Sequence, residues 1–151
     1  ADEALLIRQA RDMGYSDIPF ISTDGVDLPE FAEIGGDAVK GTVCTTHFDA
    51  AAEMSDKTAD FVAAYTEEYG VAPSAYAALA YDTYLIAYEA LKQADSYDGP
   101  TLKAILDGIE VDGVTGTISF DENGDAKKTA AVLKIVGDNG WEFLKVYESA
   151  D

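Results

Sequence analysis

The sequence predicts an α/β protein that ends in a β-hairpin. Helix-like and strand-like apolar patterns alternate over residues 2–46, which is typical of short βα units that build a parallel sheet. From Gly113 onward, apolar residues recur at every second position, which indicates strands. Two of these late strands flank Gly137–Gly140, a short connection that favours a hairpin. Ligands of parallel α/β sheets bind beyond the carboxyl ends of the strands, so polar residues there are candidate site residues.

The first 46 residues are expected to fold as helix, strand, helix and strand. Gly14 and the pair Gly35-Gly36 each follow a helical pattern, and glycine is a favourable residue just after a helix. The polar run Thr23–Gly25 predicts a turn at the carboxyl end of the first strand. The expected ranges are 2–13 for the first helix, 18–22 for the first strand, 28–34 for the second helix and 39–46 for the second strand.

Two long helices are expected next. Ser55 is the predicted N-cap of the first, which ends at Gly70, and Ser74 is the predicted N-cap of the second. Apolar and aromatic residues recur at heptad-like spacing along the second helix. They predict one buried stripe, made of Ala77, Tyr81, Tyr84, Tyr88 and Leu91.

Tyr76 lies in the first turn of this second long helix, away from the stripe. At ~100° per residue it stands roughly 140° round from Tyr81, so packing of the stripe does not explain it. An aromatic ring at the start of a helix can contact a ligand. A surface tyrosine packed against a neighbouring element is the alternative interpretation.

The last third of the chain is expected to hold a short helix after Asp98-Gly99-Pro100 and then strands. The segment Asp121–Asp125 resembles the start of a calcium loop, but Val132 stands where that loop needs a bidentate Glu, so a simple turn is predicted. The apolar patterns place helical residues at Leu102, Ile105, Leu106 and Ile109, and strands at Ile118–Phe120, Lys128–Val136 and Trp141–Tyr147.

The composition indicates a globular, strongly acidic protein of one or two domains. The 151 residues are 48% hydrophobic, and 29 acidic against 10 basic residues give a formal charge of -19. This charge repels polyanions, so nucleic acid and anionic membrane surfaces are poor candidate partners. No run of about 18 apolar residues occurs, so no transmembrane helix is expected. No signal peptide is recognisable, so an export signal is expected to have been removed or to lie outside this sequence.

The reactive side chains do not indicate an enzyme. Cys44 is the single cysteine, which excludes an internal disulfide, and its β-branched surroundings predict a buried thiol. His47 is the single histidine, and no Gly-x-Ser-x-Gly elbow accompanies it, so neither a zinc site nor a serine nucleophile is supported. No glycine-rich phosphate loop occurs, and no cofactor or metal is expected.

Three blocks of sequence resemble branched-chain amino-acid (Leu/Ile/Val-type) periplasmic binding proteins, the solute receptors of ABC importers. The blocks are Leu6–Gly14 with the following Ser22–Gly25, Ala75–Asp82, and Gly116–Asp125. Their order and separation together carry the resemblance, which covers essentially the whole chain.

The resemblance implies a type I fold, with parts of two Rossmann-like lobes and a ligand enclosed between them. By this resemblance, the chain would correspond to the C-terminal portion of such a protein and would be incomplete at the N-terminus. It implies that residues 1–70 belong to the second lobe and 71–120 to the first. Residues 121–151 would then form a hinge crossover and a final strand pair in the second lobe. The protein is then expected to be periplasmic or extracellular, with a lipid anchor as one option for its full-length form.

The same resemblance implies two ligand-binding residues. Asp24 matches a family acid that receives the α-ammonium group of an amino acid, although many members have the longer Glu there. Tyr76 matches an aromatic residue that closes over the ligand from the other lobe. Expected partners are a free amino acid, ABC permease subunits, and either the missing N-terminal portion or a second copy of the chain.

Three alternatives remain open at this point. The same fold serves as the amino-acid or amide sensing domain of receptors and regulators. A flavodoxin-like enzyme could use Asp24 as an acid or base, although Asp24 and Asp27 fit a loop residue and a helix N-cap more simply. Asp24 is also explained as an Asp-Gly turn residue that bonds its own backbone.

Overall fold

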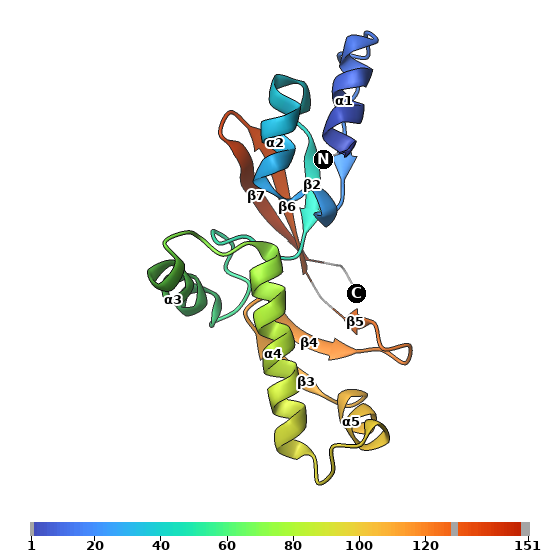
Figure 1. The fold of residues 1–151 in the computed structure, drawn as a ribbon, viewed down its shortest axis with the longest axis vertical. Coiled ribbons are helices and arrows are strands. Elements are labelled where there is room, and N and C mark those ends of the chain that lie inside the picture. Colours follow the sequence, from blue (N-terminus) through green and yellow to red (C-terminus); the bar gives the residue numbers. More distant parts are fainter. Residues whose placement is uncertain (1, 128–129, 149–151) are drawn as a thin grey trace.

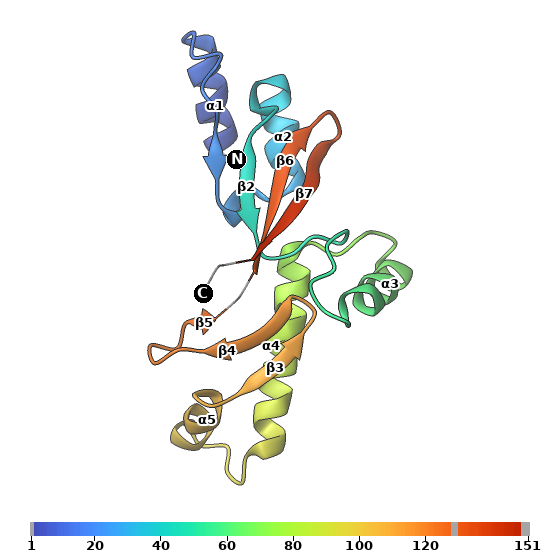
Figure 2. The same cartoon turned by 180° about the vertical axis from the view of Figure 1, so that it is seen from behind.

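The computed structural model describes residues 2–127 and 130–148. Its strands form one four-stranded and one three-stranded sheet, and each sheet has its own helices. Figures 1 and 2 show these two parts stacked along the long axis of the molecule. The helical elements are α1 (Asp2–Asp12), η1 (Asp24–Val26), α2 (Pro29–Gly35), η2 (Gly36–Val39), α3 (Thr58–Tyr69), α4 (Ala75–Gln93) and α5 (Gly99–Leu106).

The four-stranded sheet has the order β1-β2-β6-β7 and carries α1 and α2. β1 and β2 are parallel, whereas β6 pairs antiparallel with both β2 and β7. The pairing of Gly137 with Gly140 closes the predicted C-terminal hairpin. The strands are β1 (Ile21–Ser22), β2 (Val43–Thr46), β6 (Ala130–Gly137) and β7 (Gly140–Glu148). The α/β class and the hairpin are therefore confirmed.

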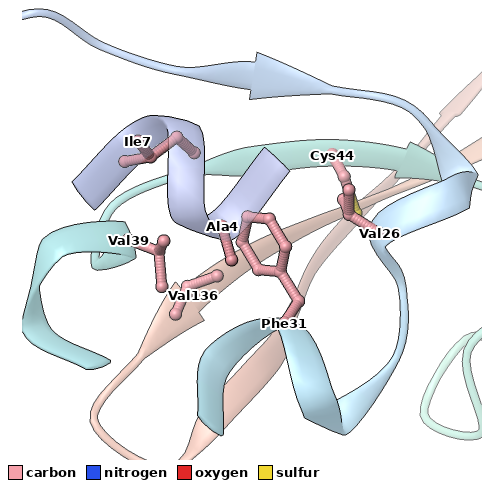
Figure 3. Close-up of a cluster of buried hydrophobic side chains, with 7 residues drawn as sticks. All are labelled: Ala4, Ile7, Val26, Phe31, Val39, Cys44 and Val136. Atoms are coloured by element: carbon pink, nitrogen blue, oxygen red, sulfur yellow. The ribbon is translucent and has the colours of Figure 1, made fainter. Parts of the chain in front are cut away.

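One apolar cluster fills the space between this sheet and its helices (Figure 3). Phe31 of α2 stacks on Trp141 of β7 with ring centroids 5.3 Å apart, which fixes the helix against the hairpin. Cys44 is fully buried, and burial raises the pKa of its thiol to about 12, as expected for an inert core residue. The cluster consists of Ala4, Ile7, Val26, Phe31, Val39, Cys44 and Val136.

The three-stranded sheet has the order β3-β4-β5 and lies beside α4. Its strands are β3 (Glu110–Gly113), β4 (Gly116–Phe120) and β5 (Ala126–Lys127). Asp82 of α4 is buried under the β3–β4 turn, where its carboxylate accepts the backbone N–H groups of Val114 and Thr115 at 2.6 and 3.0 Å. A Cβ atom at Gly113 would stand 2.5 Å from this carboxylate, so the turn requires glycine there.

Two predicted strands are shorter than expected. The run 18–22 contributes only Ile21 and Ser22 to a strand. Pro19 has no N–H group to donate to a neighbouring strand. The Arg11 guanidinium donates hydrogen bonds to the carbonyl oxygens of Tyr15, Ser16 and Ile18, so these oxygens are bonded outside the sheet. The run 39–46 becomes β2 only from Val43, since Gly41 has φ +80° and interrupts the extended backbone. Val39 instead lies in η2.

The predicted buried stripe on α4 is wrong. Four of its five members are exposed, and Tyr84 is the most exposed at 61%. The residues that α4 buries are Ala75, Ala78, Asp82 and Ala90. The small side chains on this face let α4 approach the sheet closely. The opposite face, which carries the bulky tyrosines, is exposed to solvent. Tyr84 and Tyr88 stack on one another there, with ring centroids 6.1 Å apart.

Three other predicted helix ends and turns are confirmed, and one predicted N-cap is wrong. Ser74 caps α4 by accepting the N–H of Ala77, and Gly70 ends α3 in the left-handed conformation. Ser55 does not cap α3, whose N-cap is Lys57. The Asp121 carboxylate accepts the N–H groups of Asn123 and Asp125, so the predicted turn is present. Residue 128, the predicted start of a strand, lies outside the described residues.

The connection between β2 and α3 links the two parts of the chain. The Ser55 and Thr58 hydroxyls donate to the carbonyl groups of Gly113 and Val114 at 2.8 and 2.9 Å. These bonds attach α3 to the three-stranded part. The expected lobe boundaries, between residues 70 and 71 and between residues 120 and 121, stay predictions. No helix among the described residues is long and apolar enough to cross a membrane.

Candidate functional site

Asp24 lies at the carboxyl end of β1, in the short helix η1. Its side chain is 47% exposed, and its Oδ2 atom lies 3.6 Å from Nε2 of His47, the residue directly after β2. Because β1 and β2 are parallel neighbours, their carboxyl ends meet at the same edge of the sheet. The structure therefore brings one carboxylate and one imidazole together at that edge.

Asp27, three residues later, is almost completely buried. The Thr46 hydroxyl donates to its Oδ2 at 2.8 Å, and the Lys134 ammonium donates to its Oδ1 at 2.7 Å. The interpretation of Asp27 as a helix N-cap is wrong, because Leu28 is the N-cap of α2 and no side chain caps that helix. Asp27 instead ties the turn after β1 to β2 and β6.

Lys134 also pairs with Asp49, whose Oδ2 lies 3.1 Å from its Nζ. Burial lowers the pKa of Lys134, but the hydrogen bonds and charges of Asp27 and Asp49 outweigh burial, so the pKa is raised overall. The ammonium group therefore stays charged and compensates the two carboxylates. Asp24, by contrast, has no lysine or arginine partner among the described residues.

A hollow of about 730 Å³ lies where the two parts of the chain meet. The four-stranded part contributes Asp27, Lys134 and Trp141, and the start of α4 contributes Ser74 and Ala75. The connection after β2 adds Phe48 and Asp49. In this hollow, groups from both parts face a common space.

Tyr76 lies in the first turn of α4 with 47% of its surface exposed. Figure 1 shows that α4 begins at the level where the two parts meet. Neither Tyr76 nor Asp24 lines the hollow itself, although Ala75 and Asp27 nearby do. The described contacts include none between the side chains of Asp24 and Tyr76. The structure thus places each residue at the end of its element, without bringing the two into contact.

Sequence reasoning missed two features of this region. His47 was dismissed for lack of catalytic partners, yet the rule that site residues follow the carboxyl ends of strands would have found it at the end of β2. Lys134 had no such signal, because it lies 107 residues from its partner Asp27 and inside an apolar strand pattern. Across residues 2–127 and 130–148, no cluster of His, Cys, Asp and Glu could hold a metal ion.

Comparison with known proteins supports a single family. Residues 1–140 match the family model described as "Periplasmic binding protein". The chain is 34% identical over 133 residues to the Leu/Ile/Val-binding protein homolog 1 of Brucella abortus, a match that covers 87% of this chain and 35% of that protein. The chain therefore spans about a third of the length of this relative.

Solved structures agree with the sequence matches. A leucine binding protein from Thermotoga maritima superposes with a TM-score of 0.86 at 38% identity, covering 97% of this chain and 42% of that one. A branched-chain amino acid transporter substrate binding protein from Streptococcus pneumoniae, solved in complex with isoleucine, superposes with a TM-score of 0.80 at 28% identity. That match covers 98% of this chain and 42% of that one.

Proposed function

The chain belongs to the periplasmic binding protein family, and from this premise we propose that it is part of an extracytoplasmic solute-binding protein. The proposed ligand is a free amino acid, branched-chain or otherwise apolar, held in a cleft between two lobes. The observation that carries the proposal is Asp24, an accessible carboxylate at the carboxyl end of β1 with no lysine or arginine partner among the described residues.

Asp24 would receive the α-ammonium group of the ligand. Its carboxylate charge is available, whereas Lys134 already compensates the charges of Asp27 and Asp49. A charge-assisted hydrogen bond contributes about 1.5 to 3 kcal/mol, out of roughly 8 kcal/mol that micromolar affinity requires. Asp24 alone is therefore insufficient, and other groups must hold the carboxylate and the side chain of the ligand.

Tyr76 would supply part of the apolar contact from the opposite lobe. Half of its surface is exposed at the start of α4, so the ring is free to pack on a ligand that enters between the two parts. A ligand that contacts both lobes stabilises the closed state through the contacts made only there. Closure would also remove water from the ammonium–Asp24 bond and strengthen it.

The remaining partners follow from the proposed role. The relatives named above are about two and a half times as long as this chain, so we propose that a further portion of the protein completes the first lobe and supplies the donors for the ligand carboxylate. Delivery to ABC permease subunits, a periplasmic or extracellular location and a lipid anchor belong to the same proposal. No enzymatic activity is part of it.

The test compares two ligands and two proteins. In the complete binding protein, Asp24→Asn should weaken leucine binding by about tenfold or more in calorimetry. The matched control ligand is 4-methylpentanoate, which has the leucine side chain and carboxylate but no ammonium group. Its binding should not be weaker in Asp24→Asn than in the wild type, because this ligand has no ammonium group to pair with Asp24. Unchanged leucine affinity in Asp24→Asn would remove Asp24 from the site.

A further inference from the structure

His47 occupies a fixed position beside Asp24. The residues on either side of it, Thr46 and Phe48, are buried. The Thr46 hydroxyl donates to Asp27, and the Phe48 ring packs in an apolar cluster with Ala75, Ala78 and Val114. The backbone at His47 is thus held from both sides. Its imidazole stands outside the core, with 43% of the side chain exposed.

The other side of the pair is also fixed. Asp24 begins η1, and the carbonyl group of Val26 in the same short helix accepts the indole N–H of Trp141 at 2.9 Å. Val26 itself is part of the core cluster drawn in Figure 3. The 3.6 Å separation of the His47 and Asp24 side chains therefore joins two anchored segments rather than two loose loops.

Besides Asp24, three charged groups lie on the connection that holds His47 or on segments in contact with β2. Asp24 lies in η1, Asp27 lies before α2, Asp49 follows in the same connection as His47, and Lys134 lies in β6. Asp27 and Asp49 are each paired with Lys134. Asp24 is the carboxylate that lies within ion-pair distance of the imidazole, so it is the group that an imidazolium would pair with.

We propose that His47 is a positioning residue that controls the charge of Asp24 available to the ligand, a role that rests on the proposed ammonium site. A neutral imidazole leaves the Asp24 carboxylate free to accept the ammonium group. An imidazolium forms an ion pair with the same carboxylate and competes with the ligand. Lower pH favours the imidazolium form, so it increases this competition.

Protonation of His47 and binding of the ligand oppose each other. Because the ammonium group and the His47 proton favour opposite states of the site, ligand binding expels the proton, and a lower pH weakens binding. Exposed ion pairs of this kind have modest energies, so leucine affinity should fall about threefold to fivefold between pH 7.5 and 5.5. Where part of the protein carries the His47 proton, leucine binding should release a fraction of a proton.

The test uses calorimetry of leucine binding to the complete binding protein, at several pH values and in two buffers of different ionisation enthalpy. His47→Gln should keep the wild-type affinity of pH 7.5 at every pH and should release no proton. His47→Lys carries a permanent cation, so its affinity should be low at every pH, close to the wild-type value at pH 5.5. Circular dichroism of each variant checks that it is folded.

The outcomes separate this inference from the proposed function. If Asp24→Asn weakens leucine binding but His47→Gln keeps the wild-type pH dependence and proton release, the role of His47 is overturned and the ammonium site stands. If Asp24→Asn leaves leucine binding unchanged, the ammonium site itself fails. A wild-type protein whose affinity is constant from pH 5.5 to 7.5 also overturns the role of His47.

Discussion

Asp24 and Asp27 lie in the same turn after β1, yet their carboxylates have opposite surroundings. Asp27 is 6% exposed and bonded to both Thr46 and Lys134, whereas Asp24 is half exposed and faces one imidazole. A buried charge needs a matched partner to be tolerated, and once paired it has little left to offer a ligand. Within three residues, the turn therefore holds one carboxylate that the fold uses and one that stays available, and the available carboxylate is the proposed ligand-binding group.

The largest effect should come from removing the cation that serves Asp27. Lys134→Ala leaves two largely buried carboxylates without compensation, which typically costs about 3 to 5 kcal/mol of unfolding free energy. Urea denaturation of the chain measures the loss. The matched control is Lys40→Ala, which removes an exposed lysine paired with Asp37 and Asp138 and should change stability little. Equal losses in the two variants would show that the buried cluster is not structural.

A second buried carboxylate sharpens the comparison, because backbone groups rather than a cation satisfy it. Asp82 accepts two N–H groups and the Thr115 hydroxyl under the β3–β4 turn. Asp82→Asn keeps the volume but replaces one acceptor oxygen with a donor, so it should cost roughly 2 to 3 kcal/mol. Hydrogen exchange should show the loss at Val114 and Thr115. Protection that is unchanged at these amides would contradict this assignment.

The smallest effect on stability is expected for Asp24. Asp24 has no lysine or arginine partner among the described residues, and its pair with His47 is exposed to solvent, so Asp24→Asn should change the unfolding free energy by less than about 0.5 kcal/mol. The same variant is expected to lose leucine affinity, and this separation of stability from binding distinguishes Asp24 from Asp27. A destabilisation comparable to that of Lys134→Ala would mean that Asp24 is also a structural carboxylate.

Local signals in the sequence were sufficient for much of the fold. Ser74, Gly70 and the hairpin at Gly137–Gly140 act through neighbouring backbone groups, so their effects are visible in a short window of sequence. The tyrosine stripe of α4 failed for the opposite reason. Periodicity identifies a face but does not say which face meets the sheet, and the close contact over Asp82 selected the face with small residues.

The candidate site, too, could be predicted from the sequence only in part. The position of Asp24 after β1 follows from an apolar run and a polar turn, and the rule of strand ends makes it a candidate. The reason that Asp24 rather than Asp27 is available lies in Lys134, which belongs to a strand at the other end of the chain. Long-range pairing of this kind has no local sequence signal, so only the structure distinguishes the two carboxylates.

The most direct measurement is a crystal structure of the complete binding protein with leucine bound. The account predicts that the ligand nitrogen lies within about 3.2 Å of an Asp24 carboxylate oxygen, with the Tyr76 ring packed against the ligand. Asp27 should remain bonded to Lys134 in that complex. A leucine nitrogen that contacts other groups while Asp24 points into solvent would contradict the account.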